Sequence, residues 1–481
     1  MKNKTNKTNK NSNLIEENIS ISKEQTSIKN EEFVFSKYLI FLIVLIEGFV
    51  SIGIEITAIR KMIPYGGSNI TNTSIIIGIF LFFLSIGYYK GGIITKNQDK
   101  ILLKNLLFST LIIAIGFNDF FIFHLFTNFK IDELYQITIY SLIVIAPITY
   151  FLGQTVPIIT NFINWQEKAK INGTLLFLST IGSFLGSIGT TLILMNFLGV
   201  QKTIFVYVLL LSLLLILLII FIKTKIITKI ITIFCILISL SITIFSFKFN
   251  PYVYSNQYSD VIIDYEDNLN KLIINHGYSS NYAIEEKSST FPYIKKMEFL
   301  IKNLDNNKKD ILVIGAGGFT LSLNDNLNKY TYVDIDSKLK EVSENLFLKD
   351  KIKGEFIVAD GRSYLLNNKN KWDIIVVDAF SNRNSIPSSL ITKEFFELVK
   401  SNLKKDGYFF INLIGDSFIK NNYTKHFIQT INESFSCISN NLEETRVSNI
   451  ENIVFTCTIK DNVIYTDNKI NLFEIYNPIN K

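Results

Sequence analysis

The chain has 481 residues, of which 48% are hydrophobic, and its mean hydropathy is +0.28. This is too apolar for an ordinary soluble protein of that size, and since the excess lies before residue 250 we predict a membrane half followed by a soluble half. The formal net charge is +6, but the lysines are scattered among Asn, Ile and Glu residues, so no nucleic-acid partner is expected.

The amino-terminal segment, residues 1–36, consists mainly of Lys, Asn, Glu, Ser and Thr. A segment of this kind has too little apolar surface to bury, and we predict a disordered polar tail. It is also too long and too polar to begin a cleaved signal peptide.

Residues 37–250 form the predicted membrane region. Apolar stretches long enough to cross a bilayer follow one another and predict about seven spans, at residues 38–58, 70–90, 103–126, 135–162, 173–197, 201–222 and 226–248. Pro147, Gly153 and Pro157 interrupt the fourth stretch, which we therefore expect to be kinked or partly re-entrant. The sequence thus predicts an integral, multi-pass protein of the cell membrane, embedded in the lipid bilayer.

The first predicted span carries charged residues, which are costly inside a membrane. Glu55 and Arg60 are placed to pair near the membrane interface, and a structural ion pair or headgroup contact is favoured over a substrate role for Glu47 or Glu55. In the fifth span, Gly182 and Gly186 have the spacing of a close helix contact. Packing inside the bundle is favoured there, and a homodimer contact is left open.

The side of the membrane that the soluble half faces is also left open. Most lysines of the short connections fall on one side, and the positive-inside rule places that side and the amino terminus in the cytoplasm. Seven spans would then place the soluble half outside, whereas one span fewer would place it inside.

The cysteines give no sign of a metal centre. Cys235, Cys437 and Cys457 lack metal-ligand spacing. We expect neither a metal site nor a disulfide framework from them.

The soluble half shows two successive patterns. Residues 251–290 contain short alternating runs separated by turn residues, which predict a small antiparallel β-module. Residues 291–470 alternate apolar, β-branched runs with helical stretches, as in a parallel sheet covered by helices. The predicted fold class is an α-helical membrane bundle joined to an α/β domain with the Rossmann-like sheet of S-adenosylmethionine-dependent transferases. Its strands are expected near residues 310–315, 329–334, 355–359, 373–378 and 408–413, before a closing antiparallel pair.

Glycines and acids stand where these strands end, which is where ligands bind in open α/β sheets. Gly315-Ala-Gly-Gly318 follows the first strand and offers a tight turn with free N–H groups. Its spacing departs from the dinucleotide fingerprint, which disfavours NAD. Asp334 ends the second strand and is placed to accept hydrogen bonds from ribose hydroxyls. Asp360, followed by Gly361, ends the third strand beside the expected adenine.

Asp378 ends the fourth strand after a very apolar run, with no Lys or Arg beside it in the sequence. Loss of hydration at such a place raises the pKa of a carboxyl group. We therefore predict that Asp378 orients or deprotonates an amine nucleophile.

These motifs, in this order, resemble the polyamine aminopropyltransferases, the spermidine/spermine synthase family. The similarity runs from about residue 255 to 458 and includes Ile386-Pro-Ser-Ser-Leu-Ile-Thr-Lys-Glu-Phe-Phe and Leu403-Lys-Lys-Asp-Gly407. The segment from Glu47 to Arg60, Glu-Gly-Phe-Val-Ser-Ile-Gly-Ile-Glu-Ile-Thr-Ala-Ile-Arg, is similar to the first span of the membrane-fused branch of that family.

The resemblance implies a transferase without metal or resident cofactor, whose co-substrate is decarboxylated S-adenosylmethionine. It implies that a polyamine such as putrescine attacks the methylene beside the sulfonium and releases methylthioadenosine. By the same resemblance, Asp378 would position and deprotonate the attacking amine, and Tyr293 would lie near it. The residues that the resemblance assigns to the donor are Gly315, Gly317, Gly318, Asp334, Asp360 and Gly361.

Two departures from the family concern the acceptor. Ser381 stands where soluble synthases carry a second acid, and Ile294 replaces a polar residue after the family tyrosine. Two alternatives therefore stay open: an S-adenosylmethionine-dependent methyltransferase, and a non-enzymatic transporter or sensor that a polyamine or adenosyl ligand regulates. The glycine loop holds no Arg or Lys that would pair with a methionine carboxylate, which favours the decarboxylated donor.

Overall fold

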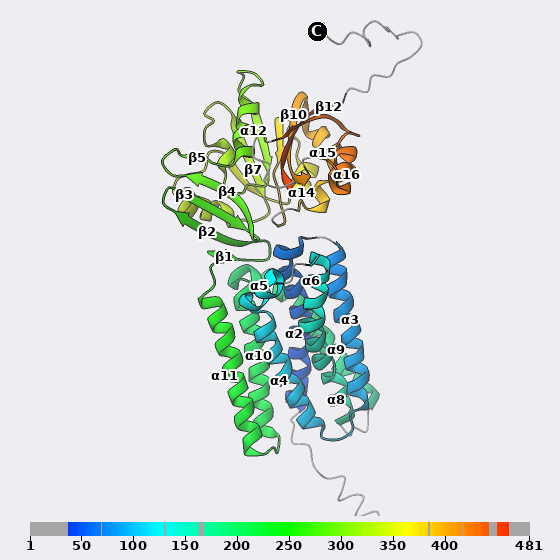
Figure 1. The fold of residues 1–481 in the computed structure, drawn as a ribbon. Helices are drawn as coiled ribbons and strands as arrows, with labels where there is room; N and C mark the ends of the chain where they lie inside the picture. The colour runs from blue at the N-terminus through cyan, green and yellow to red at the C-terminus, as the bar shows by residue number, and fades with distance from the viewer. Residues whose placement is uncertain are drawn as a thin grey trace, which may run out of the picture.

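The computed structural model describes residues 37–68, 70–128, 131–162, 168–382, 385–416, 418–441 and 450–460. The predicted polar tail and residues 461–470 of the predicted sheet domain lie outside this part. Figure 1 shows a bundle of long helices with an α/β part stacked on one end of it. The predicted fold class is confirmed, including the small antiparallel module and the mostly parallel sheet.

Six spans in the described residues are long and apolar enough to cross a membrane. A seventh exists if α4 (Gln98–Gly116) and α5 (Asp119–Asn128), which meet at 64°, are counted as one broken span. The six are α2 (Lys37–Gly66), α3 (Ile70–Ile93), the stretch Glu133–Asn161, the stretch Lys170–Leu198 that begins in α9 (Lys168–Ile188), α10 (Val200–Phe221) and α11 (Ile226–Lys248).

The sharpest break lies in a different span from the one that the sequence suggested. The Pro-containing stretch forms one span of 29 residues from α6 (Glu133–Tyr140), a π-helical turn (Ser141–Ile145), α7 (Ala146–Gly153) and α8 (Thr155–Phe162). Pro147, which lacks an N–H, lies just after the π-helical turn, where the regular hydrogen bonding of the α-helix is already interrupted. The 64° bend belongs to the third predicted stretch, between Gly116 and Asp119.

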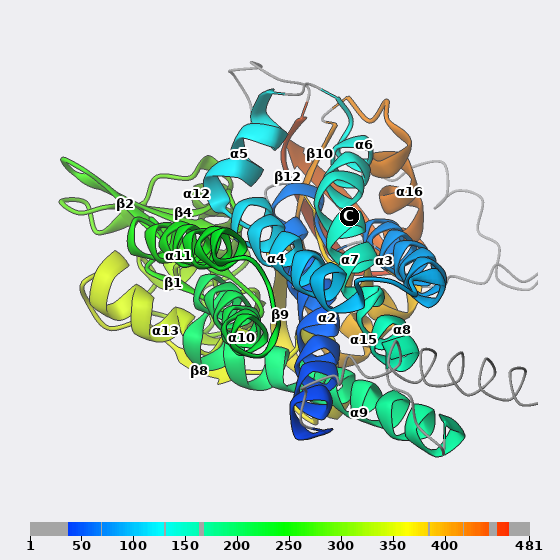
Figure 2. The ribbon, with the colours of Figure 1, turned by 90° about the horizontal axis from the view of Figure 1, so that it is seen from below.

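Helices α2 and α9 pack together through their glycines. A Cβ on Gly182 would collide with the Leu45 carbonyl oxygen, and one on Gly186 would collide with the Phe49 carbonyl oxygen. From the other side, a Cβ on Gly48 would collide with the Ser179 carbonyl oxygen. The small residues therefore let two helices of one bundle approach closely, as predicted, and Figure 2 shows α9 beside α2.

The soluble half contains two sheets. The first is antiparallel with strand order β1-β2-β3-β4-β5. In Figure 1 it lies beside the larger sheet, with β1 next to the bundle. Its strands are β1 (Tyr254–Ser255), β2 (Asp260–Glu266), β3 (Leu269–Ile274), β4 (Gly277–Ala283) and β5 (Ser288–Ser289).

The second sheet has the order β11-β12-β10-β9-β6-β7-β8. The five strands from β10 to β8 are parallel, and the β11–β12 pair closes the sheet in antiparallel fashion. Its strands are β6 (Asp310–Ile314), β7 (Lys329–Asp334), β8 (Glu355–Val358), β9 (Trp372–Val377), β10 (Leu403–Asp416), β11 (Phe435–Asn441) and β12 (Ile450–Ile459). The helices around it are α12 (Pro292–Lys302), α13 (Leu339–Val342), α14 (Gly361–Asn367), α15 (Lys393–Asn402) and α16 (Asn422–Ile431).

A disulfide joins Cys437 and Cys457, which corrects the expectation that the cysteines form none. The two residues face each other across the β11–β12 register, 20 positions apart in the chain. The sequence hid this pairing because strand register, not cysteine spacing, brings them together.

Arg60 joins the bundle to the soluble half. It lies near the end of α2, and its guanidinium pairs with the Asp260 carboxylate of β2 at 3.1 Å and 3.3 Å. Its Nε also donates to the Asn256 carbonyl oxygen at 2.8 Å. The expected Glu55–Arg60 pair is therefore wrong: the partner of Arg60 comes from the β-module.

Candidate active site

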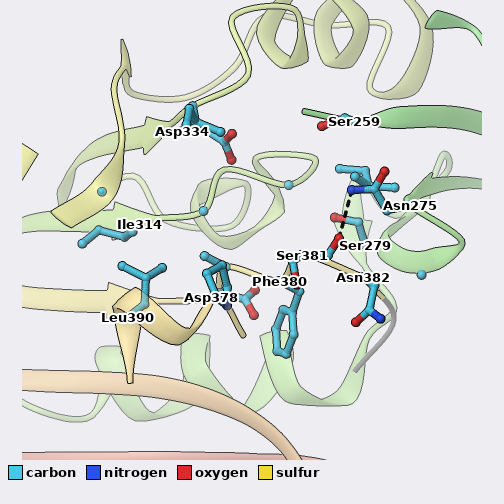
Figure 3. A pocket seen from close by; sticks show the side chains of 18 of the residues that line it. Ser259, Asn275, Ser279, Ile314, Asp334, Asp378, Phe380, Ser381, Asn382 and Leu390 are labelled. Carbon is cyan, nitrogen blue, oxygen red and sulfur yellow. Dashed lines mark hydrogen bonds between the residues drawn. The ribbon is translucent and has the colours of Figure 1, made fainter. Parts of the chain in front are cut away.

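A cavity of about 430 Å³ opens at the carboxyl ends of the parallel strands. It lies around the loop after β6, the strand from which the chain winds outward to β7 on one side and to β9 on the other. This topological switch point is the expected ligand site in an open α/β sheet. Figure 3 shows Asp334 above Asp378, with Ile314 to one side of them.

The glycine loop needs its glycines. Gly315 has φ +92°, and a Cβ there would collide with the Asp378 carbonyl oxygen. Gly317 has φ +49°, and a Cβ on Gly318 would collide with the Phe347 ring. The backbone therefore runs closer to the neighbouring strand and to the cavity than any other residue type would allow. Gly315 and Gly317 line the cavity itself.

Asp334 ends β7 at the cavity wall, as predicted from the sequence. Its carboxylate accepts hydrogen bonds from the backbone N–H groups of Ala316 at 2.9 Å and Asp336 at 3.0 Å. Burial raises the pKa of Asp334 to about 6, although these N–H donors favour the charged form. This carboxylate thus ties the glycine loop to the end of β7.

Asp360 and Gly361 also line the cavity. Asp360 caps α14, because its carboxylate accepts from the Ser363 backbone N–H at 2.8 Å. A Cβ on Gly361 would collide with the Ile314 side chain. Asp360 therefore has a structural role beside the donor-binding role that the sequence predicts.

Asp378 is held between two side chains. The Tyr293 hydroxyl donates to one carboxylate oxygen at 3.1 Å, and the Asn412 amide donates to the other at 2.9 Å. Burial raises the pKa of Asp378, and the two hydrogen bonds oppose that rise only in part. The structure thus brings together the two residues predicted for catalysis, Asp378 and Tyr293, on one wall of the cavity.

Asn412 and Asn452 were missed by the sequence reasoning. Asn412 lies in the middle of β10, is buried, and donates to the Asn452 side chain at 2.9 Å as well as to Asp378. A lone amide in the apolar run Tyr408-Phe-Phe-Ile-Asn-Leu was the available signal. A buried polar side chain in such a run needs partners, which here include a carboxylate of the cavity.

Asp336, two residues after Asp334, links the small β-module to the larger sheet. It is buried, and its carboxylate accepts from the Tyr254 hydroxyl at 2.8 Å and from the Asn256 amide at 2.9 Å. Because Asp336 also donates its N–H to Asp334, a hydrogen-bonded chain runs from Arg60 through Asn256 and Asp336 to the predicted ribose acid.

The cavity beyond Asp378 is lined by neutral groups. Asn275 donates to the Ser381 carbonyl oxygen at 3.0 Å, the dashed line in Figure 3, and Asn382 lies beside them. Ile63 near the end of α2, and Ser68 just after that helix, also line this cavity. The lining residues within the described chain include no Lys, Arg or His, and their only carboxylates are Asp334, Asp360 and Asp378.

The family model and the curated relatives are both of the spermidine synthase type. Residues 290–466 match the Spermine/spermidine synthase domain. The polyamine aminopropyltransferase of Thermotoga petrophila is 27% identical over 173 residues, which span 34% of this chain and 57% of that protein. Polyamine aminopropyltransferase 2 of Aquifex aeolicus is 23% identical over 394 residues, which span 76% of this chain and 77% of that protein. The solved spermidine synthase of Thermotoga maritima aligns with a TM-score of 0.35 and 22% identity, covering 44% of this chain and 75% of its own.

The sheet order and the glycine turn at its switch point define a Rossmann-like domain of the S-adenosylmethionine-dependent transferase type. Within that class, residues 290–466 match the Spermine/spermidine synthase domain, and the curated relatives reported above are polyamine aminopropyltransferases. The Aquifex match covers more of the chain than the soluble half contains, so the likeness to that protein extends into the helical half.

Proposed function

We propose that the protein is a membrane-bound aminopropyltransferase. It transfers the aminopropyl group of decarboxylated S-adenosylmethionine to an amine of the polyamine class, such as putrescine, and releases methylthioadenosine. The observation that carries this proposal is the buried Asp378 carboxylate, which Tyr293 and Asn412 hold at the wall of a ligand-sized cavity. The matching domain family and the apolar helices support the reaction class and the membrane location.

The donor side of the site is formed by the glycine loop and by the acids at the ends of β7 and β8. The Asp334 carboxylate would accept hydrogen bonds from the ribose hydroxyls, and Asp360 would lie at the adenine edge. Gly315 and Gly317 leave the backbone open to the adenosyl group because they carry no side chain at the cavity wall.

The chemical step is a substitution at carbon. A neutral amine nitrogen attacks the methylene beside the sulfonium, the new N–C bond forms as the C–S bond breaks, and the electron pair of that bond stays on the sulfur of methylthioadenosine. Asp378 orients the amine and accepts the proton that the nitrogen loses. Its raised pKa makes it a better base than an exposed Asp, and most of the acceleration comes from alignment of the two reactants.

The cavity lining supports the decarboxylated donor over S-adenosylmethionine. A methionine carboxylate would need a cation or several hydrogen-bond donors at that end of the cavity. Within the described residues, the lining offers no cation, and Arg362, which follows Gly361, donates to the Ser389 carbonyl oxygen and the Thr392 hydroxyl. A methyltransferase is therefore the less supported alternative.

The test uses the purified full-length protein in detergent with putrescine and either donor. We expect methylthioadenosine with the decarboxylated donor and no S-adenosylhomocysteine with S-adenosylmethionine. S-adenosylhomocysteine would instead identify a methyltransferase. If neither product forms while a donor still binds, the transporter or sensor alternative replaces the enzyme.

A further inference from the structure

A second cavity of about 370 Å³ adjoins the one that contains Asp378. Ser68, Ser381 and Ile414 line both cavities, so the two meet along one wall. The second cavity continues between the loop that follows β9 and the start of α16, where Ser388 and Tyr423 line it. An acceptor whose amine lies at Asp378 and whose chain passes Ser381 would place its far end in this second cavity.

The second cavity is polar but uncharged in its described lining. Its polar side chains are hydroxyls and an amide, from Ser68, Ser381, Ser385, Ser388, Asn421 and Tyr423, and none of its described lining residues is an acid or a base. An ammonium group moved there from water would lose hydration without meeting a carboxylate, which is unfavourable. A hydroxyl or amide would find hydrogen-bond partners of its own kind.

The helical half contributes one described lining residue, Ser68, to this cavity. Ser68 follows directly on Gly67, which has φ +70°, and a Cβ on Gly67 would lie 3.0 Å from the Ser385 hydroxyl. Gly67 therefore brings the end of α2 against the loop after β9. The Arg60–Asp260 pair fixes the same end of α2 to the β-module, whose Asn275 holds the Ser381 carbonyl oxygen.

We propose that the second cavity is the subsite for the far end of the acceptor, and that this acceptor has one amine at Asp378 and an uncharged, hydroxyl- or amide-bearing chain in the subsite. An amino alcohol or an N-acylated diamine fits this description better than putrescine, whose second ammonium would meet no carboxylate among the described residues of the subsite. The proposal rests on the proposed aminopropyl transfer and specifies its acceptor.

The first test compares acceptors of similar reach on the full-length protein, with methylthioadenosine as the readout. We expect N-acetylputrescine and 4-aminobutanol to exceed putrescine in kcat/KM by tenfold or more. A preference for putrescine would overturn the subsite proposal and leave the aminopropyltransferase proposal standing. Failure of every acceptor to yield methylthioadenosine would overturn the aminopropyltransferase proposal, and this one with it.

Two variants test the location of the subsite. Ser388 lines only the second cavity, and Ser388→Trp should lower kcat/KM for N-acetylputrescine at least tenfold more than for n-propylamine. Ser401→Trp, on the exposed side of α15, is the matched control and should leave that ratio unchanged. An unchanged ratio in a folded Ser388→Trp protein contradicts the proposal.

A negative charge at Ser381, which lines both cavities, should reverse the preference between acceptors. Ser381→Asp should move the preference at least tenfold towards putrescine, because the new carboxylate would pair with its second ammonium. Ser381→Asn, of nearly the same size, should not. Equal preferences in the two variants would mean that the far end of the acceptor does not reach Ser381.

Discussion

The Arg60–Asp260 pair is predicted to hold the α/β half on the helical bundle. Both side chains are almost fully buried, at 4% and 5% exposure, and their charged atoms are 3.1 Å and 3.3 Å apart. At such a separation, two unit charges attract by about 5 kcal/mol at an effective dielectric of about 20. Arg60→Met leaves Asp260 buried without this partner, which for a buried pair costs about 3–5 kcal/mol.

The pKa of Asp260 is shifted in the direction expected for a carboxylate that pairs with Arg60. Burial alone would raise the pKa of Asp260, but Arg60 and then Lys61 hold it below its ordinary value of 3.8. A carboxyl group with a lowered pKa in the folded state stabilises the fold above its unfolded pKa and loses that contribution as the pH falls through the folded value. The pair therefore contributes fully at neutral pH, where the variants are to be compared.

The assay is a double-variant cycle on the detergent-solubilised protein, read as the melting temperature of the soluble half. A loss of about 3–5 kcal/mol corresponds to a fall of roughly 6–20 °C for a domain of this size. Arg60→Met combined with Asp260→Asn should recover most of that fall, since no unpaired charge then stays buried. Arg60→Met should also raise KM for the donor, because Arg60 holds Asn256 and, through it, Asp336 and Asp334.

Lys61→Met is the matched control for this cycle. Lys61 is equally buried but pairs with Asp119 inside the helical half, so its loss should leave KM for the donor close to that of the wild type. If Arg60→Met has the melting temperature of the wild-type protein, the pair does not stabilise the soluble half. If the melting temperature of the double variant falls by the sum of the two single falls, Arg60 and Asp260 do not act as a pair.

Three further predictions concern the site and the sheet. Burial raises the pKa of Asp334 to about 6, and only the charged carboxylate accepts fully from two ribose hydroxyls. The kcat/KM for the donor should therefore rise as the pH increases through about 6. A kcat/KM that does not change with pH in the wild type would exclude Asp334 as the ribose acceptor. Asn412→Leu removes a hydrogen bond that lowers the pKa of Asp378. The acid limb of the pH profile of kcat/KM for the amine should therefore move to higher pH. A shift to lower pH would contradict the assignment of that limb to Asp378. The disulfide closes a segment of 20 residues, so Cys437→Ser should lower the free energy of unfolding of the sheet by about 3 kcal/mol, as measured by urea unfolding without reductant. Reductant should cause the same loss in the wild type and no further loss in the variant. A variant as stable as the oxidised wild type would contradict this prediction.

The ends of the parallel strands could be predicted from the sequence, because each strand and the glycine or acid that follows it lie next to each other in the chain. Gly315, Asp334 and Asp378 each follow a short β-branched run, and parallel strands collect such endings at one edge. Asn412 was not assigned, because its role depends on β10 lying beside β9, a pairing between residues far apart in the chain. The same limitation hid the Cys437–Cys457 disulfide.

The junction between the halves could not be predicted either. Arg60 has Glu55 five positions before it, and local spacing favoured that acid as its partner. The observed partner, Asp260, is 200 positions away and meets Arg60 only once the β-module packs on the bundle. The contribution of Ile63 and Ser68 to the cavity follows from that same packing.

In the proposed reaction, Asp378 accepts the proton of the attacking amine. The most direct measurement is single-turnover formation of methylthioadenosine by Asp378→Asn, with donor binding measured on the same preparation. The account predicts a fall of about 10²–10⁴-fold in rate with donor affinity close to that of the wild type. Wild-type rates in a variant that binds donor normally would contradict it.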